Sequence, residues 1–506
     1  MKKTLLSMVK GTVILTLAGM IARVLGFFFK QYLTSQIGAE GMGLIQLTMP
    51  LMALVQAVYA SGLTSTVSSM VASNPPYARH VTFRAIGLGL ISGIGVALFV
   101  WKGAPWLAQS MGDSRLLESM TIIAISIPVI GISAAIKGYY MGLQQMRYPA
   151  VAQIAEQVAR IGISYGLVVS LWDGVALAQA AMLCTLGTAM GEIIGLIAVF
   201  LPYLLGTKKN ALQNSSHQDG LTRQLLLRCL PSSAGKLATS LLTVVETALI
   251  PVALARSGMT ASQSLSSLGL VEGISMPLIM LPGMVCTSLS NVAIPTISAA
   301  KLNKKERQEK VGICMQIALS MGFVMAGVFR GYSDLVAYVT YPESNVGSII
   351  NGLAPCCIFA YPMFVLAGTM QALRLQKRQL ANTLIGYGLR IGLYWFLAGR
   401  LGLSGYILSL IISYGVICVL DVFRVITYTN LSMKMLSWSW LPALCYLGLV
   451  VTAKRLSVII CTIAQGSRLL ILLMVGAIGM VALLIALSTL WYQMITGDSE
   501  VGDKGE

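Results

Sequence analysis

The stretch Gly19–Gln46 reads GMIARVLGFFFKQYLTSQIGAEGMGLIQ, and its first half places two permanent cations in an apolar run long enough to cross a bilayer. Arg23 and Lys30 are seven residues apart, so a helix carries them on one face with Gly19 and Gly26. A cation at mid-membrane costs about 2.5–3.5 kcal/mol unless it faces water, a partner or a ligand. We therefore expect a helix that lines a polar cavity for an anionic substrate. The alternative is an ion pair for Arg23, with Lys30 reaching the interface.

The rest of the chain is equally apolar. Its 506 residues are 56% hydrophobic and 10% charged, with a mean hydropathy of +0.79. This composition is typical of an all-α polytopic membrane protein and excludes a soluble domain. The first apolar run follows Lys2, Lys3 and Lys10 but has no small-residue cleavage site, so we expect an uncleaved first span.

Apolar segments of spanning length predict about 14 transmembrane helices. They cover residues 11–33, 44–72, 82–101, 117–142, 149–171, 178–205, 225–256, 268–299, 311–330, 347–371, 380–399, 403–427, 438–453 and 468–492. None of the intervening loops is long enough to form a domain. We therefore expect the chemistry to lie within the membrane.

The net charge of +17 is concentrated in alternate loops, including the basic segments 206–224 and 300–310. Cytoplasmic loops of membrane proteins carry an excess of Lys and Arg. The alternation predicts a multi-pass protein of the bacterial cell membrane with both termini in the cytoplasm. The charge is explained by topology, so we expect membrane lipids and no nucleic acid as partners.

An internal repeat relates the two halves of the chain. Met49-Pro50-Leu51 matches Met276-Pro277-Leu278 at an offset of 227, and Arg160-Ile-Gly162 matches Arg390-Ile-Gly392 at an offset of 230. The offset covers six predicted helices, an even number, so the two halves have the same orientation. We expect an N-lobe at 1–205, a basic linker at 206–224, a C-lobe at 225–427, and at 428–506 two further helices with an acidic cytoplasmic tail.

Charged residues also lie within the predicted spans of the second half. Lys236 and Glu246 fall on the span that repeats the first one, and Glu272 opens the next span. If the two lobes enclose a cavity, the cations of the first span and of its repeat face one another. We expect Lys236 and Glu246 to line this cavity, with a salt-bridged interior as the alternative.

One pair of charges within a span has a simpler explanation. Glu156 and Arg160 are four residues apart, a favourable spacing for an ion pair along one helix. Arg390 occupies the equivalent place in the second half but has no carboxylate four residues before it. A role in substrate binding therefore remains open for Arg390.

The sequence offers little material for metal or cofactor chemistry. Its nine cysteines lie mostly inside apolar runs without a CxxC motif, and both histidines, His80 and His217, fall in predicted loops. Buried cysteines of this kind usually act as small apolar side chains. We expect no cofactor, no metal and no catalytic residues.

Several motifs resemble those of one membrane-protein family. Arg23-Val-Leu-Gly26-Phe27 with Lys30 and Gly38-Ala39-Glu40-Gly41-Met42-Gly43-Leu44 resemble the first helix and first loop of the polysaccharide-exporter branch of the multidrug/oligosaccharidyl-lipid/polysaccharide (MOP) flippase superfamily. Lys137-Gly138-Tyr139-Tyr140 and Gln153-Ile-Ala-Glu156-Gln157 resemble its helices 4 and 5. The resemblance extends to about residue 427.

The resemblance implies a fold like that of the multidrug exporters of the same superfamily, in two lobes. It also implies outward flipping, by alternating access, of a lipid II-like undecaprenyl-pyrophosphate glycan for spore cortex peptidoglycan, with cortex-synthesis enzymes as further partners. We expect Arg23, Lys30 and Lys236 to contact the diphosphate. Lysine replaces the arginine expected at positions 30, 137 and 236, which keeps the charge but loses bidentate phosphate binding.

Three other functions are consistent with parts of the sequence. An ion-coupled multidrug exporter would use Glu246 and Glu272 to bind cationic drugs. A membrane glycosyltransferase would need acid or base residues near the membrane surface, for which Asp334 and Glu343 are the candidates. A scaffold could recruit enzymes through the basic loops. The cations within the spans and the six-helix repeat favour the flippase.

Overall fold

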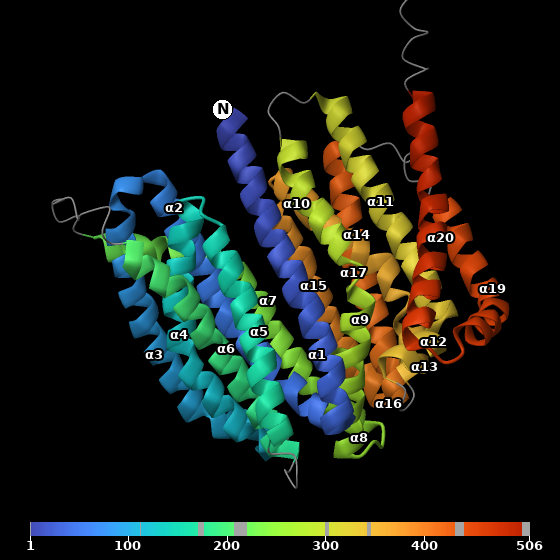
Figure 1. Ribbon diagram of the computed structural model, residues 1–506, viewed down its shortest axis with the longest axis horizontal. Coiled ribbons are helices and arrows are strands. Elements are labelled where there is room, and N and C mark those ends of the chain that lie inside the picture. Colours follow the sequence, from blue (N-terminus) through green and yellow to red (C-terminus); the bar gives the residue numbers. More distant parts are fainter. Residues whose placement is uncertain are drawn as a thin grey trace, which may run out of the picture. The chain divides into compact units, whose positions relative to one another are not determined.

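The computed structural model describes residues 2–111, 113–170, 177–206, 220–298, 303–341, 346–430 and 440–497 (Figure 1). In these ranges all regular elements are helical, which confirms the all-α class. Most of the predicted linker 206–224, Glu343 and the end of the acidic tail lie outside the described residues. Contacts divide the chain into two compact units, Met1–Ala255 with Met259–Gly269 and Arg256–Gly258 with Leu270–Glu506.

The first unit contains eight α-helices, one short π-helix (η1) and two short 3₁₀ helices (η2 and η3). They are α1 (Lys2–Gln56), η1 (Ala57–Leu63), α2 (Thr64–Ser73), η2 (Pro75–Tyr77), α3 (Ala78–Ser110), η3 (Ser114–Leu116), α4 (Leu117–Gly142), α5 (Arg147–Ser170), α6 (Leu177–Leu205), α7 (Leu221–Arg256) and α8 (Ala261–Leu268). Within it α3 packs on α4, α5 on α6, and α1 on α5, α6 and α8.

The long helix α1 is two helices joined at Gly38. Gly38 has φ 73° and ψ 178°, a conformation that is essentially restricted to glycine. A methyl group added there would meet no atom within 4 Å, so the backbone conformation and not the available space requires glycine. The break separates the predicted spans 11–33 and 44–72, so Arg23 and Lys30 lie on the helix that precedes it.

The second unit begins in a wide helical turn and contains the remaining helices. They are η5 (Gly269–Ser275), α9 (Met276–Met280), α10 (Met284–Ser298), α11 (Lys304–Gly331), α12 (Ser333–Thr340), α13 (Val346–Leu353), α14 (Cys356–Ala372), α15 (Gln376–Leu393), η6 (Tyr394–Ala398), α16 (Gly399–Leu401), α17 (Leu403–Thr429), α19 (Trp440–Ala464) and α20 (Arg468–Gly497). Helix α14 packs on α10, α11 and α17, while α11 also packs on α19 and α20. The buried Tyr361 of α14 donates a hydrogen bond to the Ile279 carbonyl in α9 at 2.7 Å.

The predicted lobe boundary at residue 225 and the compact units describe different properties. The units reflect packing, and they place most of α7 and all of α8 with the first unit. The lobes were inferred from the repeat in the sequence. The division into lobes at 1–205 and 225–427 therefore stays a prediction.

Among the described residues, nine helices are long and apolar enough to span a membrane, or up to 11 if each of two bent helix pairs is one span. Each pair bends by 54° at its break. The segment Ile14–Ser73 counts once, although it covers two predicted spans. Helices α5 and α15 are not among the eleven, and both carry charged or amide side chains within their length. The multi-pass membrane class is confirmed, and the count of 14 stays a prediction.

Some predicted boundaries were wrong. The span expected at 82–101 is part of α3, which runs from Ala78 to Ser110, so His80 lies in a helix and not in a loop. The span expected to end at residue 453 continues as α19 to Ala464. Lys454 and Arg455 suggested a loop, but long basic side chains can remain in a helix and extend their charges to water. The predicted loop 331–346 likewise contains the short helix α12.

Glycine contacts between α3 and α4 yield a test of the packing. A methyl group on Gly89 would lie 2.6 Å from the Gly131 carbonyl oxygen, so Gly89→Ala should force the two backbones apart. We expect a loss of about 1–3 kcal/mol and a lower melting temperature in detergent. Gly87→Ala is the matched control on the same helix, because its methyl group meets no atom within 4 Å. Equal melting temperatures for the two variants would contradict this packing.

Candidate functional site

The cationic stripe of α1 lies against α5. A methyl group on Gly19 would be 3.7 Å from Gln153 Nε2, and one on Gly26 would be 3.0 Å from Gln157 Nε2. Arg23 lies between these two glycines on the same face, and its side chain is exposed. The Arg23 side chain forms no ion pair or hydrogen bond with any residue that the structure describes. The alternative interpretation, an ion pair between Arg23 and another helix, is therefore not seen among the described residues.

Lys30 follows on the same stripe and is half-buried. The Lys30 carbonyl accepts a hydrogen bond from Thr34 Oγ1 at 2.8 Å. Just beyond it, the rings of Tyr32 and Tyr165 lie 5.2 Å apart and hold α1 against α5. This aromatic pair adds to the packing of α1 on α5.

Helix α7 carries two of the predicted site residues in the same unit. The Lys236 side chain is exposed and forms no ion pair with the described residues, whereas Glu246 is 5% exposed. One turn before Lys236, Ser233 Oγ donates a hydrogen bond to the Val58 carbonyl in η1 at 3.2 Å. This contact ties α7 to the segment that follows α1.

Glu272 and Arg390 lie in the second unit. Tyr406 of α17 donates its hydroxyl hydrogen to Glu272 Oε1 at 2.8 Å. Arg390 is 4% exposed, and its Nε donates to Ser413 Oγ. The rings of Tyr387 and Tyr414 lie 5.0 and 4.6 Å from its guanidinium carbon, a cation–π arrangement that stabilises a desolvated cation.

The six predicted residues thus divide between the two units. Four belong to the first unit: Arg23, Lys30, Lys236 and Glu246. Two belong to the second: Glu272 and Arg390. Their proposed roles in substrate binding stay predictions.

A partly buried ion-pair cluster in the first unit extends the pair predicted on α5. Arg160 Nη2 lies 3.0 Å from Glu156 Oε1, which confirms the predicted pair. Glu156 Oε2 also lies 3.5 Å from Lys137 Nζ of α4, and Arg160 lies 3.8 Å from Glu192 of α6. Glu192, 4% exposed, accepts a hydrogen bond from Gln56 Nε2 at 3.0 Å. Two cations and two carboxylates therefore neutralise one another.

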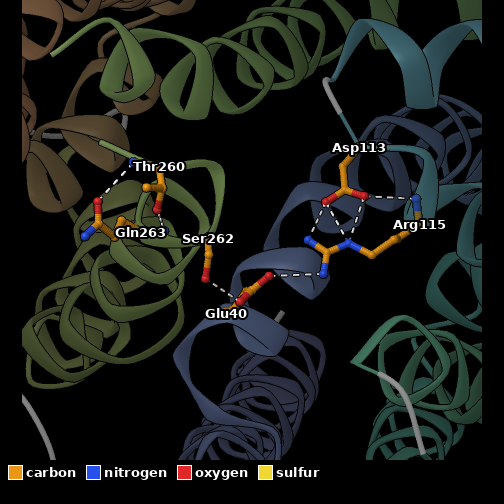
Figure 2. Close-up of polar contacts among 6 residues, drawn as sticks. All are labelled: Glu40, Asp113, Arg115, Thr260, Ser262 and Gln263. Carbon is orange, nitrogen blue, oxygen red and sulfur yellow. Dashed lines mark hydrogen bonds and ion pairs between the residues drawn. The ribbon is translucent and has the colours of Figure 1, made fainter. Parts of the chain in front are cut away.

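A second network that sequence reasoning missed lies at the break in α1. Glu40 accepts hydrogen bonds from Arg115 Nη1 at 3.0 Å and from Ser262 Oγ, and Figure 2 shows its carboxylate between these two side chains. Asp113 Oδ2 accepts from Arg115 Nη2 at 2.7 Å and orients the guanidinium. The network joins α1, the turn between α3 and α4, and α8. No spacing in the sequence predicts that these residues meet.

The start of α8 is fixed by a capping box (Figure 2). The Thr260 hydroxyl accepts from the Gln263 backbone N–H at 3.2 Å, and Gln263 Oε1 accepts from the Thr260 backbone N–H at 2.9 Å. The two bonds satisfy donors that a helix start leaves without partners. They hold Ser262 in the first turn, where it reaches Glu40. The sequence signal is the Thr-x-x-Gln spacing.

The described residues contain no group of three or more His, Cys, Asp or Glu side chains placed to hold a metal ion. The polar chemistry of the site rests on cations, carboxylates, amides and hydroxyls. Such groups can bind an anionic or polar ligand.

Comparisons with known proteins identify the family of the chain. A family model described as "Polysaccharide biosynthesis protein" matches residues 8–301. Stage V sporulation protein B of Bacillus subtilis (strain 168) is 28% identical over 417 residues, which cover 79% of this chain and 80% of that protein. Lipid II flippase MurJ of the same organism is 23% identical and covers 80% of each chain.

Solved structures show the same fold. Lipid II flippase MurJ in an inward closed conformation matches 96% of this chain and 100% of its own with a TM-score of 0.70. An inward-facing multidrug resistance MATE family transporter of the MOP superfamily matches 81% of this chain and 96% of its own with a TM-score of 0.66. Both are 15% identical to the chain, so they show the fold alone. The expected likeness to multidrug exporters is confirmed.

The ion-pair cluster predicts that Glu156→Gln destabilises the protein. The change leaves Lys137 and Arg160 with one carboxylate between them, and an uncompensated cation among packed helices is costly. Because the pairs are partly exposed, we expect a loss of about 2 kcal/mol, below the 3–5 kcal/mol typical of fully buried pairs.

Thermal melts of the full chain in detergent would measure this loss. The double variant Glu156→Gln with Lys137→Gln removes one charge of each sign and should recover part of the melting temperature. Glu118→Gln is the control, because Glu118 is exposed and forms no ion pair with the described residues. A Glu156→Gln protein as stable as the Glu118→Gln control would show that the cluster does not contribute to stability.

Proposed function

Because the chain belongs to the polysaccharide biosynthesis protein family, within the MOP flippase superfamily, we propose that it flips a lipid-linked sugar precursor across the membrane. The chain is a multi-pass membrane flippase of this superfamily, and its relatives are transporters and not enzymes. The proposal concerns the substrate: an undecaprenyl-pyrophosphate glycan similar to lipid II.

The observation that carries the proposal is Arg23 on the cationic stripe of α1, which is exposed and forms no ion pair with the residues that the structure describes. A cation in a membrane-spanning helix is expensive unless water or a ligand receives it. Lys236 of α7 is also exposed and forms no ion pair with the described residues. Lys30 lies on the same stripe as Arg23. A diphosphate would supply the negative charge that Arg23 and Lys236 lack among the described residues.

The names of the relatives support the identity of the substrate. Lipid II flippase MurJ and stage V sporulation protein B each align with about four fifths of the chain. A lipid II-like precursor for spore cortex peptidoglycan is consistent with both names. Enzymes of cortex synthesis would then receive the flipped product and are the partners that we propose.

The direction of transport follows from the charge distribution. The basic loops predict that both termini lie in the cytoplasm, where the lipid-linked precursor would be taken up. A membrane potential acts on an anionic headgroup with about 2.3 kcal/mol per charge per 100 mV, so it can drive outward flipping without a coupling ion. The six-helix lobes 1–205 and 225–427 would alternate access to the site.

An ion-coupled multidrug exporter is the second candidate. The fold shared with a MATE family transporter and the buried carboxylate of Glu246 favour it. Cationic drugs need unneutralised carboxylates, whereas the exposed charges on α1 and at Lys236 are cations. Energy-dependent efflux of a cationic dye from vesicles, with no flipping of lipid II, would establish the exporter instead.

We predict that Arg23→Ala abolishes flipping while the protein still inserts and folds. The assay follows labelled lipid II in vesicles that contain the purified full chain, and the variant removes the cation that the diphosphate would bind. Arg84→Ala is the matched control, because Arg84 is also exposed and without an ion pair among the described residues, but lies on α3. Full activity of Arg23→Ala would refute the cationic site, and an inactive, folded wild type would refute the lipid II substrate.

A further inference from the structure

Two amide side chains on α5 face the cationic stripe of α1. Gln153 and Gln157 are four residues apart, so they lie on one side of the helix, about 6 Å apart along its axis. Both are half-buried, and neither side chain hydrogen-bonds to any residue that the structure describes. An amide carries two donors and an acceptor, and burying it without partners is costly. These two amides are therefore available to a polar ligand.

The position of the amides relative to the cation is fixed by the glycines of α1. A methyl group on Gly19 would contact Gln153 Nε2 at 3.7 Å, and one on Gly26 would contact Gln157 Nε2 at 3.0 Å. Arg23 is on the same face of α1 between these glycines, so its backbone lies between the two amides. A ligand held by the Arg23 guanidinium would therefore be within reach of both amides.

The other polar groups on this part of α5 are already engaged. Glu156 is bound by Lys137 and Arg160, and Arg160 also approaches Glu192. Their charges are therefore neutralised within the protein. The α5 groups next to Arg23 that remain for a ligand are neutral amides, whose donors and acceptor together match the hydroxyl and acetamido groups of a sugar.

We propose that Gln153 and Gln157 form a glycan-binding face that recognises the sugar next to the diphosphate. This inference rests on the proposed function, since it assumes that Arg23 receives the diphosphate of a lipid-linked sugar. The amides distinguish a lipid that carries a glycan from one that ends in the diphosphate. The cation supplies attraction to both lipids, and the amides supply selectivity between them.

The test is a binding measurement on the full chain in nanodiscs with two lipids, lipid II and undecaprenyl diphosphate without sugar. We expect the wild type to bind lipid II more tightly. The double variant Gln153→Leu with Gln157→Leu should lose about tenfold in affinity for lipid II, as expected for two neutral hydrogen bonds, and keep its affinity for the bare diphosphate. Leucine has a similar size and suits an apolar helix, so folding should be preserved.

Three variants separate this inference from the proposed function. Gln109→Leu is the matched control, because Gln109 is exposed on α3 and its side chain forms no hydrogen bond with the described residues; it should bind both lipids as the wild type does. Arg23→Ala should weaken both lipids alike. An unchanged preference for lipid II in the double variant, or an equal loss for both lipids, would overturn the glycan-binding face. An Arg23→Ala protein that binds both lipids normally would overturn the diphosphate site instead.

A variant that adds a methyl group beside Gln157 tests the proposed glycan-binding face in a second way. In Gly26→Ala the new methyl group lies 3.0 Å from Gln157 Nε2 and should displace that amide. We expect a several-fold loss of affinity for lipid II and no change for the bare diphosphate. Gly162→Ala on α5 is its control, because its methyl group meets no atom within 4 Å. Equal affinities of the two variants for lipid II would contradict a role for Gln157.

Discussion

The cost of charge among apolar helices is the constraint on which this structure depends. A cation in such a place must be neutralised by a carboxylate, surrounded by polarisable groups or left to water and ligands. The chain uses all three solutions. Arg160 and Lys137 have carboxylate partners, and Arg390 has a hydroxyl and two tyrosine rings. Arg23 and Lys236 have neither among the described residues.

Cations that are held by other side chains contribute to packing, whereas the exposed cations are left for a ligand. The cluster around Glu156 connects α4, α5 and α6, so its charges serve the packing of the first unit. The environment of Arg390 does the same between α15 and α17 in the second unit. The repeat placed Arg160 and Arg390 at equivalent positions. Arg160 lies against Glu156, and Arg390 lies against Ser413 and two tyrosine rings.

Features that depend on local spacing could be predicted from the sequence. Apolar length predicts most of the helices, and the i,i+4 spacing of Glu156 and Arg160 predicts their ion pair. The break at Gly38 falls between two predicted spans, although its glycine-only conformation is a property of the backbone that composition does not reveal. Lys454 and Arg455 misled the prediction because their charges resemble those of a loop.

The contacts that were missed join residues far apart in the chain. Gln56 meets Glu192, and Glu40 meets both Arg115 and Ser262. No periodicity indicates which helices become neighbours or at what height their side chains meet. The part of the site formed by one helix, the stripe with Arg23 and Lys30, could therefore be predicted. The amides that face this stripe from α5 could not.

The contact between α1 and α8 has a consequence for biosynthesis. Gly43 packs against the Leu265 backbone and Gly269 against that of Ala39, so residues 259–269 complete a unit whose other members end at residue 255. A ribosome must therefore deliver more than half of the polypeptide to the membrane before the first unit can close. Until then the second half of α1 stays in the bilayer with its glycine surface open to lipid or to an insertion chaperone.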